Sequence, residues 1–545
     1  MRFSSSAFRL LVWLLALAGF LPVSISRAAE EEHPLRPNIV LILADDLGFS
    51  DVGCYGGEIG TPNIDRLAGE GMKFSQFYNC AVCRTTRVSL ITGLHPRRRK
   101  GRMLHDNMTT LAEVVQSAGY RTSLIGKWHF PVKKETDKNR LPTRRGFESF
   151  YGLAAGCSNY FDPSLPNPDF YRGQDPYPFL DQEKEITEFP SDFYTTDAFT
   201  DRAVGQIGEF SKGEDPKPFF LHLCYTAPHY PLHAKPEDIA EFKGKYDEGY
   251  FALRETRVER LRELGIVDPK WKLSDPDPDT SDFVYDYGVI PWEEVKNLER
   301  EKRRMEVYAA MVRSMDRGIG QVMEALDKAE VAENTVVIFL SDNGGCASHS
   351  GYKREDVRKA HEDYNKELPG SVDTYDYVAQ GWGWAQNAPF RRYKVWTYEG
   401  GISTPMIVRW PGNIEAGTMT NEVGHVVDFM PTIMDLSGAK YPKSRSGVPV
   451  PSADGHSLMP VLKGESRPEY PSLCWYLYGN RAVRQGKWKL VWGSDRKEWE
   501  LYDMENDRTE TEDLSAKLPE RVLKMEAEWM KWAKETGAPL KGNAI

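Results

Sequence analysis

Residues 38–48 read NIVLILADDLG, an apolar run that ends abruptly in two aspartates. The part from Ile39 to Ala44 is continuous and contains several β-branched side chains, which is typical of a strand buried on both faces of a sheet. Such strands belong to α/β proteins, in which helices cover both faces of the sheet. Asp45 and Asp46 would then stand at the carboxyl end of this strand, where open α/β sheets bind their ligands.

Later segments repeat the alternation of helix and strand. Cap residues and apolar periodicity predict helices over residues 61–71, 109–119 and 308–329. Apolar runs that end in polar residues predict strands within residues 121–129, 218–229 and 334–345. The sequence therefore predicts an α/β fold with a large mixed, mostly parallel sheet sandwiched by helices.

The pattern changes near residue 465. Residues 481–515 alternate like the strands of antiparallel hairpins, with a turn near Gly493, and a charged helix is expected from Pro519. We expect a catalytic domain over 34–464 and a small C-terminal α+β subdomain over 465–545. Two segments rich in proline, aspartate and tyrosine, 160–195 and 230–300, are expected to form long loops with short helices.

The N-terminus has the three parts of an export signal. Arg2 and Arg9 precede an apolar run over residues 10–25, and Ser26-Arg27-Ala28 has the small-x-small pattern of a cleavage site. A membrane anchor is the alternative, but the run is short for a span and is interrupted by a proline. The sequence predicts a signal peptide over 1–28, an exported (periplasmic or secreted) protein, and no membrane span after signal removal.

The bulk composition fits a globular enzyme. The 545 residues are 40% hydrophobic and 28% charged, and the net charge of −10 argues against nucleic acid as a partner. The seven cysteines are scattered and odd in number, so at least one is unpaired. Cys80-x-x-Cys83 stands alone, without the paired motifs of a zinc site.

Two acidic pairs follow predicted strands. Asp45, Asp46 and Asp342 offer carboxylate oxygens and Asn343 offers an amide oxygen. A set of ligands made only of oxygen suits Ca²⁺ or Mg²⁺. The alternative is that these residues serve as ordinary turn and cap residues at strand ends.

Basic side chains also follow strands or lie in a loop. Lys127 and His129 belong to GKWH, His229 to APH, and Lys394 to NAPFRRYKVWTYEGGISTP. Each histidine alone is more often a packed residue than a catalyst. Together, and beside a divalent cation, these groups would bind a tetrahedral oxyanion and supply an acid and a base.

Nine motifs in one order carry a family resemblance. They are RPNIVLILADDLG, TPNIDRLAGEGMKF, CRTTRVSLITG, GKWH, RGFESFYG, APHYPLHA, SDNGG, YEGGISTPMIVRWPG and WELYDMENDRTETEDL. Over residues 36–515 the chain resembles the type I sulfatase family, arylsulfatase-like, of the alkaline-phosphatase-like superfamily. Details such as GCSNYFDP resemble bacterial members that act on sulfated glycans. The resemblance implies a sulfuric ester hydrolase that acts on a sulfated polysaccharide or an aryl sulfate.

The resemblance gives the cysteine of CRTTR a special role. In the family this cysteine is oxidised to formylglycine by a formylglycine-generating or anaerobic maturation enzyme, and one hydroxyl of the hydrate attacks sulfur. The register with RVSLITG selects Cys83 and Arg87, while Cys80 and Arg84 have the same spacing but the wrong register. The family has proline or alanine where this chain has Thr85, so the resemblance leaves the conversion of Cys83 open.

The resemblance also implies roles for the other residues. Ca²⁺ would be bound by Asp45, Asp46, Asp342 and Asn343. Arg87 and Lys127 would stabilise the hydrate, His129 would accept a proton, His229 would protonate the leaving alcohol, and Lys394 would bind the sulfate.

Two other functions remain open at this point. A phosphatase or phosphonate hydrolase of the same superfamily would need further ligands for a second metal. A non-catalytic binder of sulfated glycans would leave Cys83 unconverted. Four aromatic residues are either a platform for sugar or packing residues: Tyr160, Phe161, Trp382 and Trp384.

Overall fold

The structure, a computed structural model, describes residues 36–96, 103–130, 135–168, 170, 177–214, 216–277, 288–347 and 355–540. The predicted signal peptide, residues 1–28, lies outside the described residues, so export stays a prediction. Among the helices of the described ranges, none combines the length and apolarity that a bilayer span requires.

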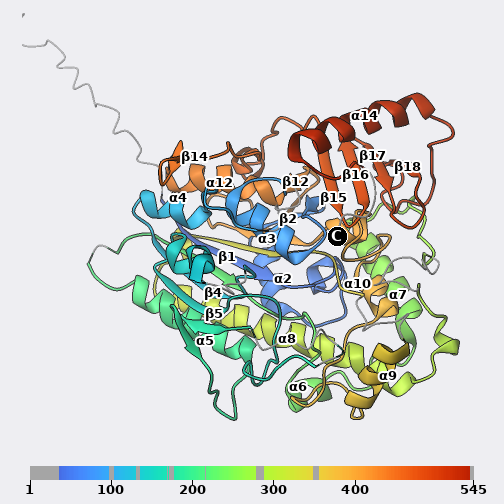
Figure 1. Ribbon diagram of the computed structural model, residues 1–545, viewed down its shortest axis with the longest axis horizontal. Helices are drawn as coiled ribbons and strands as arrows, with labels where there is room; N and C mark the ends of the chain where they lie inside the picture. Colours follow the sequence, from blue (N-terminus) through green and yellow to red (C-terminus); the bar gives the residue numbers. More distant parts are fainter. Residues whose placement is uncertain are drawn as a thin grey trace, which may run out of the picture. The chain divides into compact units, whose positions relative to one another are not determined.

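The strand β1 (Asn38–Ala44) lies inside a ten-stranded sheet, as its apolar run predicts (Figure 1). Strands β9, β1, β8, β4 and β5 run parallel, and β10 is antiparallel to its neighbours β9 and β2. The prediction of a mixed, mostly parallel sheet is confirmed. In spatial order the strands are β11 (Thr418–Thr420), β2 (Met72–Phe74), β10 (Met406–Arg409), β9 (Thr335–Ser341), β1, β8 (Phe219–Cys224), β4 (Arg121–Gly126), β5 (Ser149–Leu153), β6 (Phe179–Asp181) and β7 (Lys184–Ile186).

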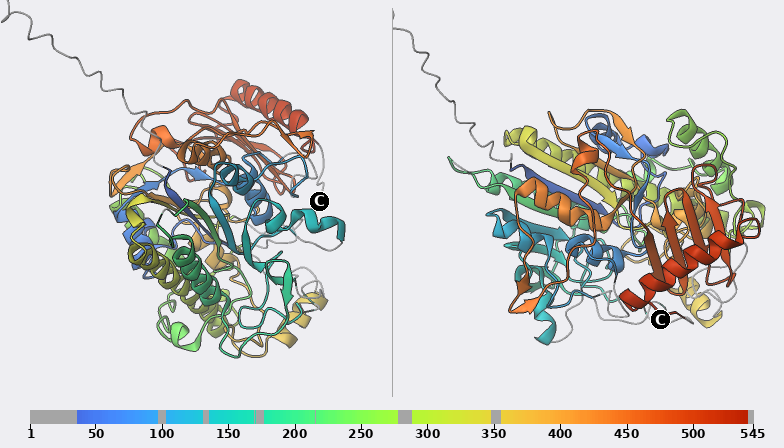
Figure 2. Two further views of the ribbon diagram at one scale, coloured as in Figure 1. Left: turned by 90° about the vertical axis from the view of Figure 1, so that its left-hand side faces the viewer. Right: turned by 90° about the horizontal axis from the view of Figure 1, so that it is seen from above.

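Alternate residues of β1 belong to two different cores. Ile39, Leu41 and Leu43 pack with apolar residues of α3, α4 and α12, whereas the residues between them pack with those of α2, α5 and α8. Helices therefore cover both faces of the sheet (Figures 1 and 2). These helices are α2 (Pro62–Gly69), α3 (Cys83–Thr92), α4 (Leu111–Ser117), α5 (Thr195–Phe210), α8 (Leu298–Lys328) and α12 (Phe429–Ser437).

Two helices differ from the prediction. The helix α8 begins at Leu298, ten positions before the predicted start, because Asn297 caps it by accepting a hydrogen bond from the Arg300 amide at 3.0 Å. The helix α7 (Gly249–Glu263) lies in a segment predicted as loop with short helices. Its buried face includes Arg254 and Arg257, so the apolar period that reveals a helix is weak.

The C-terminal region forms a separate antiparallel sheet, in the order β15 (Leu473–Leu477), β16 (Asn480–Gln485), β17 (Trp488–Trp492) and β18 (Trp499–Asp503). The pairing of β17 with β18 is the hairpin predicted around Gly493. The helix α14 (Pro519–Thr536) runs across this sheet and buries Met525 and Trp529 against it (Figure 2, right). The C-terminal α+β arrangement is confirmed, while the domain boundary at residue 465 stays a prediction.

Short elements complete the described chain. The helices are α6 (Pro236–Ala240), α9 (Glu355–Tyr364), α10 (Gln380–Gln386), α11 (Glu399–Ile402) and α13 (Met459–Leu462). The strands are β3 (Phe77–Tyr78), β12 (Gly424–His425), β13 (Ser444–Arg445) and β14 (Val448–Pro449).

Candidate active site

The carboxyl ends of four neighbouring parallel strands bring the predicted residues together. Two acidic pairs follow β1 and β9, the GKWH segment follows β4, and the APH segment follows β8. Because these strands are adjacent and parallel, their polar ends share one edge of the sheet. The N-terminus of α3 adds Cys83 and Arg87, and the loop between α10 and α11 adds Lys394.

The four predicted metal ligands are fully buried and close together. Asp45, Asp46, Asp342 and Asn343 are each at most 1% exposed. One oxygen on each of three ligands accepts no hydrogen bond from the described residues: Asp45 Oδ1, Asp46 Oδ2 and Asn343 Oδ1. Buried acceptors are almost always satisfied, so three open oxygens in one place fit a hard divalent cation.

A residue of α8 contacts the turn that carries Asp46. Asp46 has a φ of 67°, which is uncommon for a residue other than glycine. The hydroxyl of Tyr308 donates to Asp51 Oδ2 at 2.6 Å and lies 3.2 Å from the Asp46 carbonyl oxygen, and Asp51 Oδ2 also accepts a hydrogen bond from the Gly48 amide. Tyr308 thus supports the turn, and nothing in the sequence distinguishes it from other residues of a buried helix.

Each buried cation of the site has a carboxylate partner. Arg87 Nε donates to Asp342 Oδ2 at 2.9 Å, and Lys394 Nζ lies 2.5 Å from Asp46 Oδ1. Lys127 Nζ pairs with Asp45 Oδ2. The site therefore pairs three carboxyl groups with three cations.

The charges of the site move the pKa values of its carboxylates in opposite directions. Burial alone would raise the pKa of Asp45, but the charge of Lys127, that of His229 when it is protonated, and that of Arg87 hold it below its usual value. Burial and the nearby negative charge of Asp45 raise the pKa of Asp342 to about 7. A bound cation would favour the charged form of Asp342 and relieve this repulsion.

Cys83 is the cysteine that faces the carboxylates. It is the first residue of α3, is 6% exposed, and has its sulfur within 4.8 Å of an oxygen of Asp45 and of Asp342. Burial raises the pKa of its thiol, against the effect of Lys127 and Lys394. Cys80 packs instead in the apolar core, with its sulfur 3.5 Å from Ser89 Oγ. Of these two cysteines, Cys83 is thus the one at the carboxylates, and its catalytic role stays a prediction.

Thr85, the departure from the family pattern, is accommodated in the first turn of α3. Its hydroxyl lies within hydrogen-bond distance of two carbonyl oxygens, at 3.0 Å from Cys80 and 2.9 Å from Val82. Cys83 is not half of a disulfide.

The two histidines are neutral at pH 7. Burial, then the charges of Lys127 and Arg84, lower the pKa of His129, whose Nδ1 is buried without a hydrogen-bond partner among the described residues. Burial lowers the pKa of His229 to about 4, although Asp46 opposes this. His229 Nδ1 lies 2.6 Å from the Tyr230 carbonyl oxygen, so Nδ1 carries the proton and Nε2, 3.4 Å from Asp46 Oδ2, is free to exchange one.

Side chains of the C-terminal sheet are hydrogen-bonded to two loops of the candidate site. The sheet itself contributes none of the predicted site residues. Trp475 Nε1 donates to the Asn79 carbonyl oxygen at 2.8 Å, beside the loop that leads to Cys83. Asn480 Nδ2 donates to the Val395 carbonyl oxygen at 3.3 Å, beside Lys394. The sequence shows the strands that carry these side chains but not their long-range contacts.

The aromatic residues proposed as a sugar platform are mostly packing residues. Tyr160, Trp382 and Trp384 are at most 5% exposed, and Trp382 Nε1 donates to the Glu301 carbonyl oxygen at 2.8 Å. Phe161 is half-buried and packs against the core that includes residues of α2, α5 and α8.

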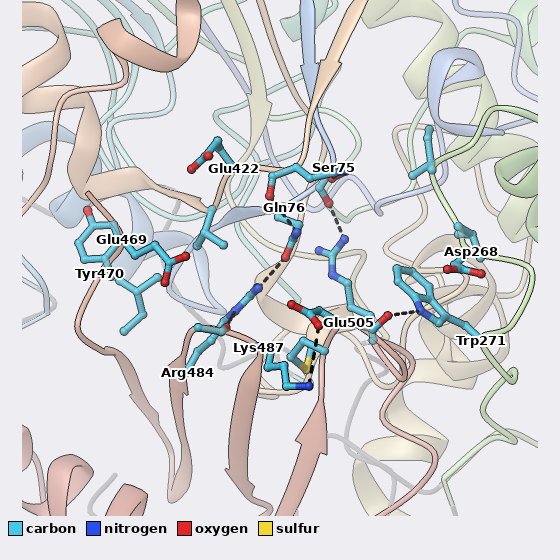
Figure 3. A pocket seen from close by; sticks show the side chains of 18 of the residues that line it. Ser75, Gln76, Asp268, Trp271, Glu422, Glu469, Tyr470, Arg484, Lys487 and Glu505 are labelled. Carbon is cyan, nitrogen blue, oxygen red and sulfur yellow. Dashed lines mark hydrogen bonds and ion pairs between the residues drawn. The ribbon is translucent and has the colours of Figure 1, made fainter. Parts of the chain in front are cut away.

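A cavity of about 620 Å³ lies apart from these residues, between the end of α7 and the C-terminal sheet (Figure 3). None of the predicted site residues lines it. Two of its arginines already have protein partners: Arg484 donates to Gln76 Oε1 at 2.7 Å and Arg508 to the Ser75 carbonyl oxygen at 2.6 Å. The candidate active site therefore lies at the sheet edge and not in this cavity.

The mostly parallel sheet, with acidic oxygens and basic groups gathered at one edge, has the alkaline-phosphatase-like fold of its solved structural neighbours. Comparison with family models is more specific. The model named Sulfatase matches residues 37–439, and the model named N-sulphoglucosamine sulphohydrolase, C-terminal, matches residues 390–530. The chain belongs to the sulfatase family, a family of sulfuric ester hydrolases.

Individual relatives agree with this assignment. An uncharacterized sulfatase of Schizosaccharomyces pombe is 31% identical over 92% of this chain and 94% of its own length. An arylsulfatase of Klebsiella aerogenes is 30% identical over 83% of this chain and 97% of its own length. Among solved structures, Ps i-CgsB in complex with k-i-k-neocarrahexaose matches with a TM-score of 0.65 and 27% identity, over 94% of this chain and 95% of that one.

Proposed function

We propose that the chain is exported and hydrolyses a sulfate ester of a sulfated glycan, with Ca²⁺ and with Cys83 converted to formylglycine. The observation that carries the proposal is the pairing of a buried Cys83 with open oxygens on Asp45, Asp46 and Asn343. A thiol beside a set of carboxylates has no obvious structural use. It is explained by a site that holds a cation and a nucleophile together.

Four residues would hold Ca²⁺: Asp45, Asp46, Asp342 and Asn343. When bound, the cation supplies positive charge for a sulfate oxygen and for the ionised nucleophile. Lys127 and Lys394 now pair with Asp45 and Asp46. With the carboxylates neutralised by the cation, these two ammonium groups are released to bind the anionic substrate.

Formylglycine at position 83 supplies a hydrate with two hydroxyl groups, one to attack sulfur and one whose proton is later removed. Arg87 is fixed by Asp342 and by the carbonyl oxygen of Lys127, which its Nη1 contacts at 2.8 Å. That anchoring fixes the guanidinium of a residue that follows residue 83 by about one turn of α3. His129 is neutral and has an open nitrogen, as required of a group that accepts a proton from the second hydroxyl.

His229 is placed to protonate the leaving alcohol oxygen. Its Nδ1 is fixed by Tyr230, which leaves Nε2 as the titrating nitrogen. Its pKa of about 4 reflects burial among cations, and the arrival of a sulfate monoanion would raise it toward the range of a useful acid. Lys394 would bind the sulfate oxygens from the opposite loop.

The glycan class rests on the relatives. Ps i-CgsB was crystallised with a neocarrahexaose, and the C-terminal family model carries the name of an N-sulphoglucosamine sulphohydrolase. A phosphatase or phosphonate hydrolase of the same superfamily is less well supported. Among the described residues, both groups of metal-donor side chains include Asp45 and lie at this one edge of the sheet.

The test is peptide mass spectrometry over residues 79–93 together with turnover of an aryl sulfate. We expect formylglycine at position 83, multiple turnovers, and a Cys83→Ser variant that binds substrate but stalls, since serine lacks the second hydroxyl. Unmodified cysteine in protein from the native host, with bound but intact sulfate esters, would support the non-catalytic binder. Hydrolysis by Cys83→Ala would show that another nucleophile operates.

A further inference from the structure

Arg84, the second residue of α3, carries a charge without a partner. The residue is half-buried, its Nε is inaccessible to water, and its guanidinium makes no hydrogen bond or ion pair with any part of the chain that the structure describes. Three more deeply buried arginines are paired: Arg87 with Asp342, Arg257 with Asp51, and Arg304 with Asp376. A partly desolvated cation left unpaired is costly, which indicates that its partner comes from outside the protein.

The position of Arg84 places this charge at the candidate active site. Arg84 follows Cys83 directly and precedes Arg87 by three residues, so the two arginines lie on one face of α3 in successive turns. Arg87 reaches the carboxylates. The charge of Arg84 also acts on His129, where it helps to lower the pKa after burial and Lys127.

The charge balance of the site leaves Arg84 as the surplus cation. Asp342, Asp45 and Asp46 already pair with Arg87, Lys127 and Lys394, respectively. A scissile sulfate group would be bound by those groups and by the cation. Arg84 is therefore available to a different part of the substrate.

We propose that Arg84 binds a second anionic group, a sulfate or a carboxylate, on the same sugar unit as the scissile sulfate. This inference rests on the proposed function and extends it to a class of substrate, the units that carry two negative charges. A guanidinium is suited to this task because its planar fork donates two parallel hydrogen bonds to either oxyanion. Arg84 thus determines specificity and takes no part in the transfer of sulfate.

The test measures binding without turnover, in a Cys83→Ala background and with Ca²⁺ present. Calorimetry would give the affinities for phenyl sulfate, 2-carboxyphenyl sulfate and catechol disulfate, with and without Arg84→Gln. Removal of the charge should lower the preference for the two dianions over phenyl sulfate by about 10- to 100-fold. Arg84→Lys should restore part of the preference, and Arg521→Gln on α14 is the matched control, with no expected change.

The Cys83→Ala background separates this inference from the proposed function. Arg84 lies inside the maturation motif, so its effect on activity alone would mix recognition with conversion of Cys83. Equal losses of affinity for all three compounds, or no loss for any, would overturn the role of Arg84. The protein with Cys83 intact could fail to hydrolyse any of the three compounds, which would refute the proposed function. A preference for the dianions that still depends on Arg84 would then uphold the inference on its own. A preference for only one dianion identifies the second group as sulfate or carboxylate.

Discussion

The side chain of Asn480 in the C-terminal sheet is hydrogen-bonded to the backbone of Val395, the residue after Lys394. Val395 has a φ of 85°, which a β-branched residue adopts only under constraint. Its amide is held as well, by a hydrogen bond of 2.7 Å to the Ala81 carbonyl oxygen near the nucleophile. The strained residue thus joins the loop of Lys394, the loop of Cys83 and the C-terminal sheet.

We predict that Asn480→Ala lowers kcat/KM for an aryl sulfate by about 10-fold, because a small displacement of Lys394 weakens the binding of sulfate in the transition state. The change should also cost about 1–3 kcal/mol of unfolding free energy, since Asn480 is fully buried and accepts a hydrogen bond from the Ser494 amide. Leu490→Val, in the core between the sheet and α14, controls for stability alone. Equal losses of activity in both variants would show that Asn480 acts only through stability.

Removal of calcium should destabilise the protein. The open oxygens of Asp45, Asp46 and Asn343 are buried together only in the folded state, which is therefore the form that binds the cation. Added Ca²⁺ should stabilise the folded state by about 3 kcal/mol at 100 times the dissociation constant. We expect a rise in the thermal midpoint on adding Ca²⁺ to chelator-treated protein, and little rise in Asp46→Asn. Asp435→Asn, an exposed change on α12, should respond like the wild type. No response of the wild type would argue against a cation site.

His229→Ala should distinguish esters by their leaving groups. General acid catalysis is worth about 100- to 10,000-fold when the leaving alkoxide is poor, and little when it is an acidic phenol. We therefore expect a much larger loss of kcat/KM for an alkyl or sugar sulfate than for 4-nitrophenyl sulfate. A loss of similar size for both esters would assign His229 to binding or structure.

Thr85→Pro should raise the fraction of Cys83 converted to formylglycine in a heterologous host, because proline restores the family pattern. The folded protein tolerates the change in principle, since residue 85 is in the first turn of α3, where the amide has no partner inside the helix. Peptide mass spectrometry and specific activity should rise together. Thr85→Val, which keeps the shape of threonine and removes its hydroxyl, is the control. A converted fraction that proline does not change would show that Thr85 is no obstacle to maturation.

A buried pair of glutamates should make stability depend on pH. Glu399 and Glu510 share Lys489, each with an oxygen 2.8 Å from its Nζ. Burial raises the pKa of Glu510 to about 7, and the charge of Glu399 adds to this effect. Burial would also raise the pKa of Glu399, but Lys489 and Arg508 lower it to about 2. In this pair, Glu510 is therefore the carboxyl group that is protonated near neutral pH, and Glu399 is the one that is ionised.

The folded state binds this proton more tightly than the unfolded state, so the stability that Glu510 contributes is complete below about pH 4.5 and is lost as the pH rises through about 7. The opposite contribution of Glu399 is complete above about pH 4.5 and disappears only in strong acid. We expect the free energy of unfolding to fall by up to about 3 kcal/mol between about pH 5 and pH 8. Glu510→Gln mimics the protonated form and should flatten this fall in denaturant titrations. An unchanged slope would assign the pH dependence to other groups.

The sequence predicted the sheet and the site for the same physical reason. A parallel strand covered on both faces must be apolar along its whole length, so the polar residues that follow it, such as Asp45 and Asp342, stand out. Residues that support the site from distant elements have no such pattern in the sequence. Tyr308 lies in an ordinary buried helix and Asn480 at the start of a hairpin strand, and only the folded chain brings them to Asp46 and Val395. The helix α7 was missed because its buried arginines hide the apolar period.

The bond between Trp475 and Asn79 has a consequence for the timing of biosynthesis. The two residues are separated by 396 positions, so the loop that leads to Cys83 leaves the ribosome long before Trp475 is synthesised. At about 5–20 residues per second, the interval is roughly 20–80 s. An enzyme that modifies Cys83 must act while the residue is exposed, and in the finished fold it is 6% exposed. The late arrival of the C-terminal sheet would thus limit the time in which the proposed conversion of Cys83 can take place.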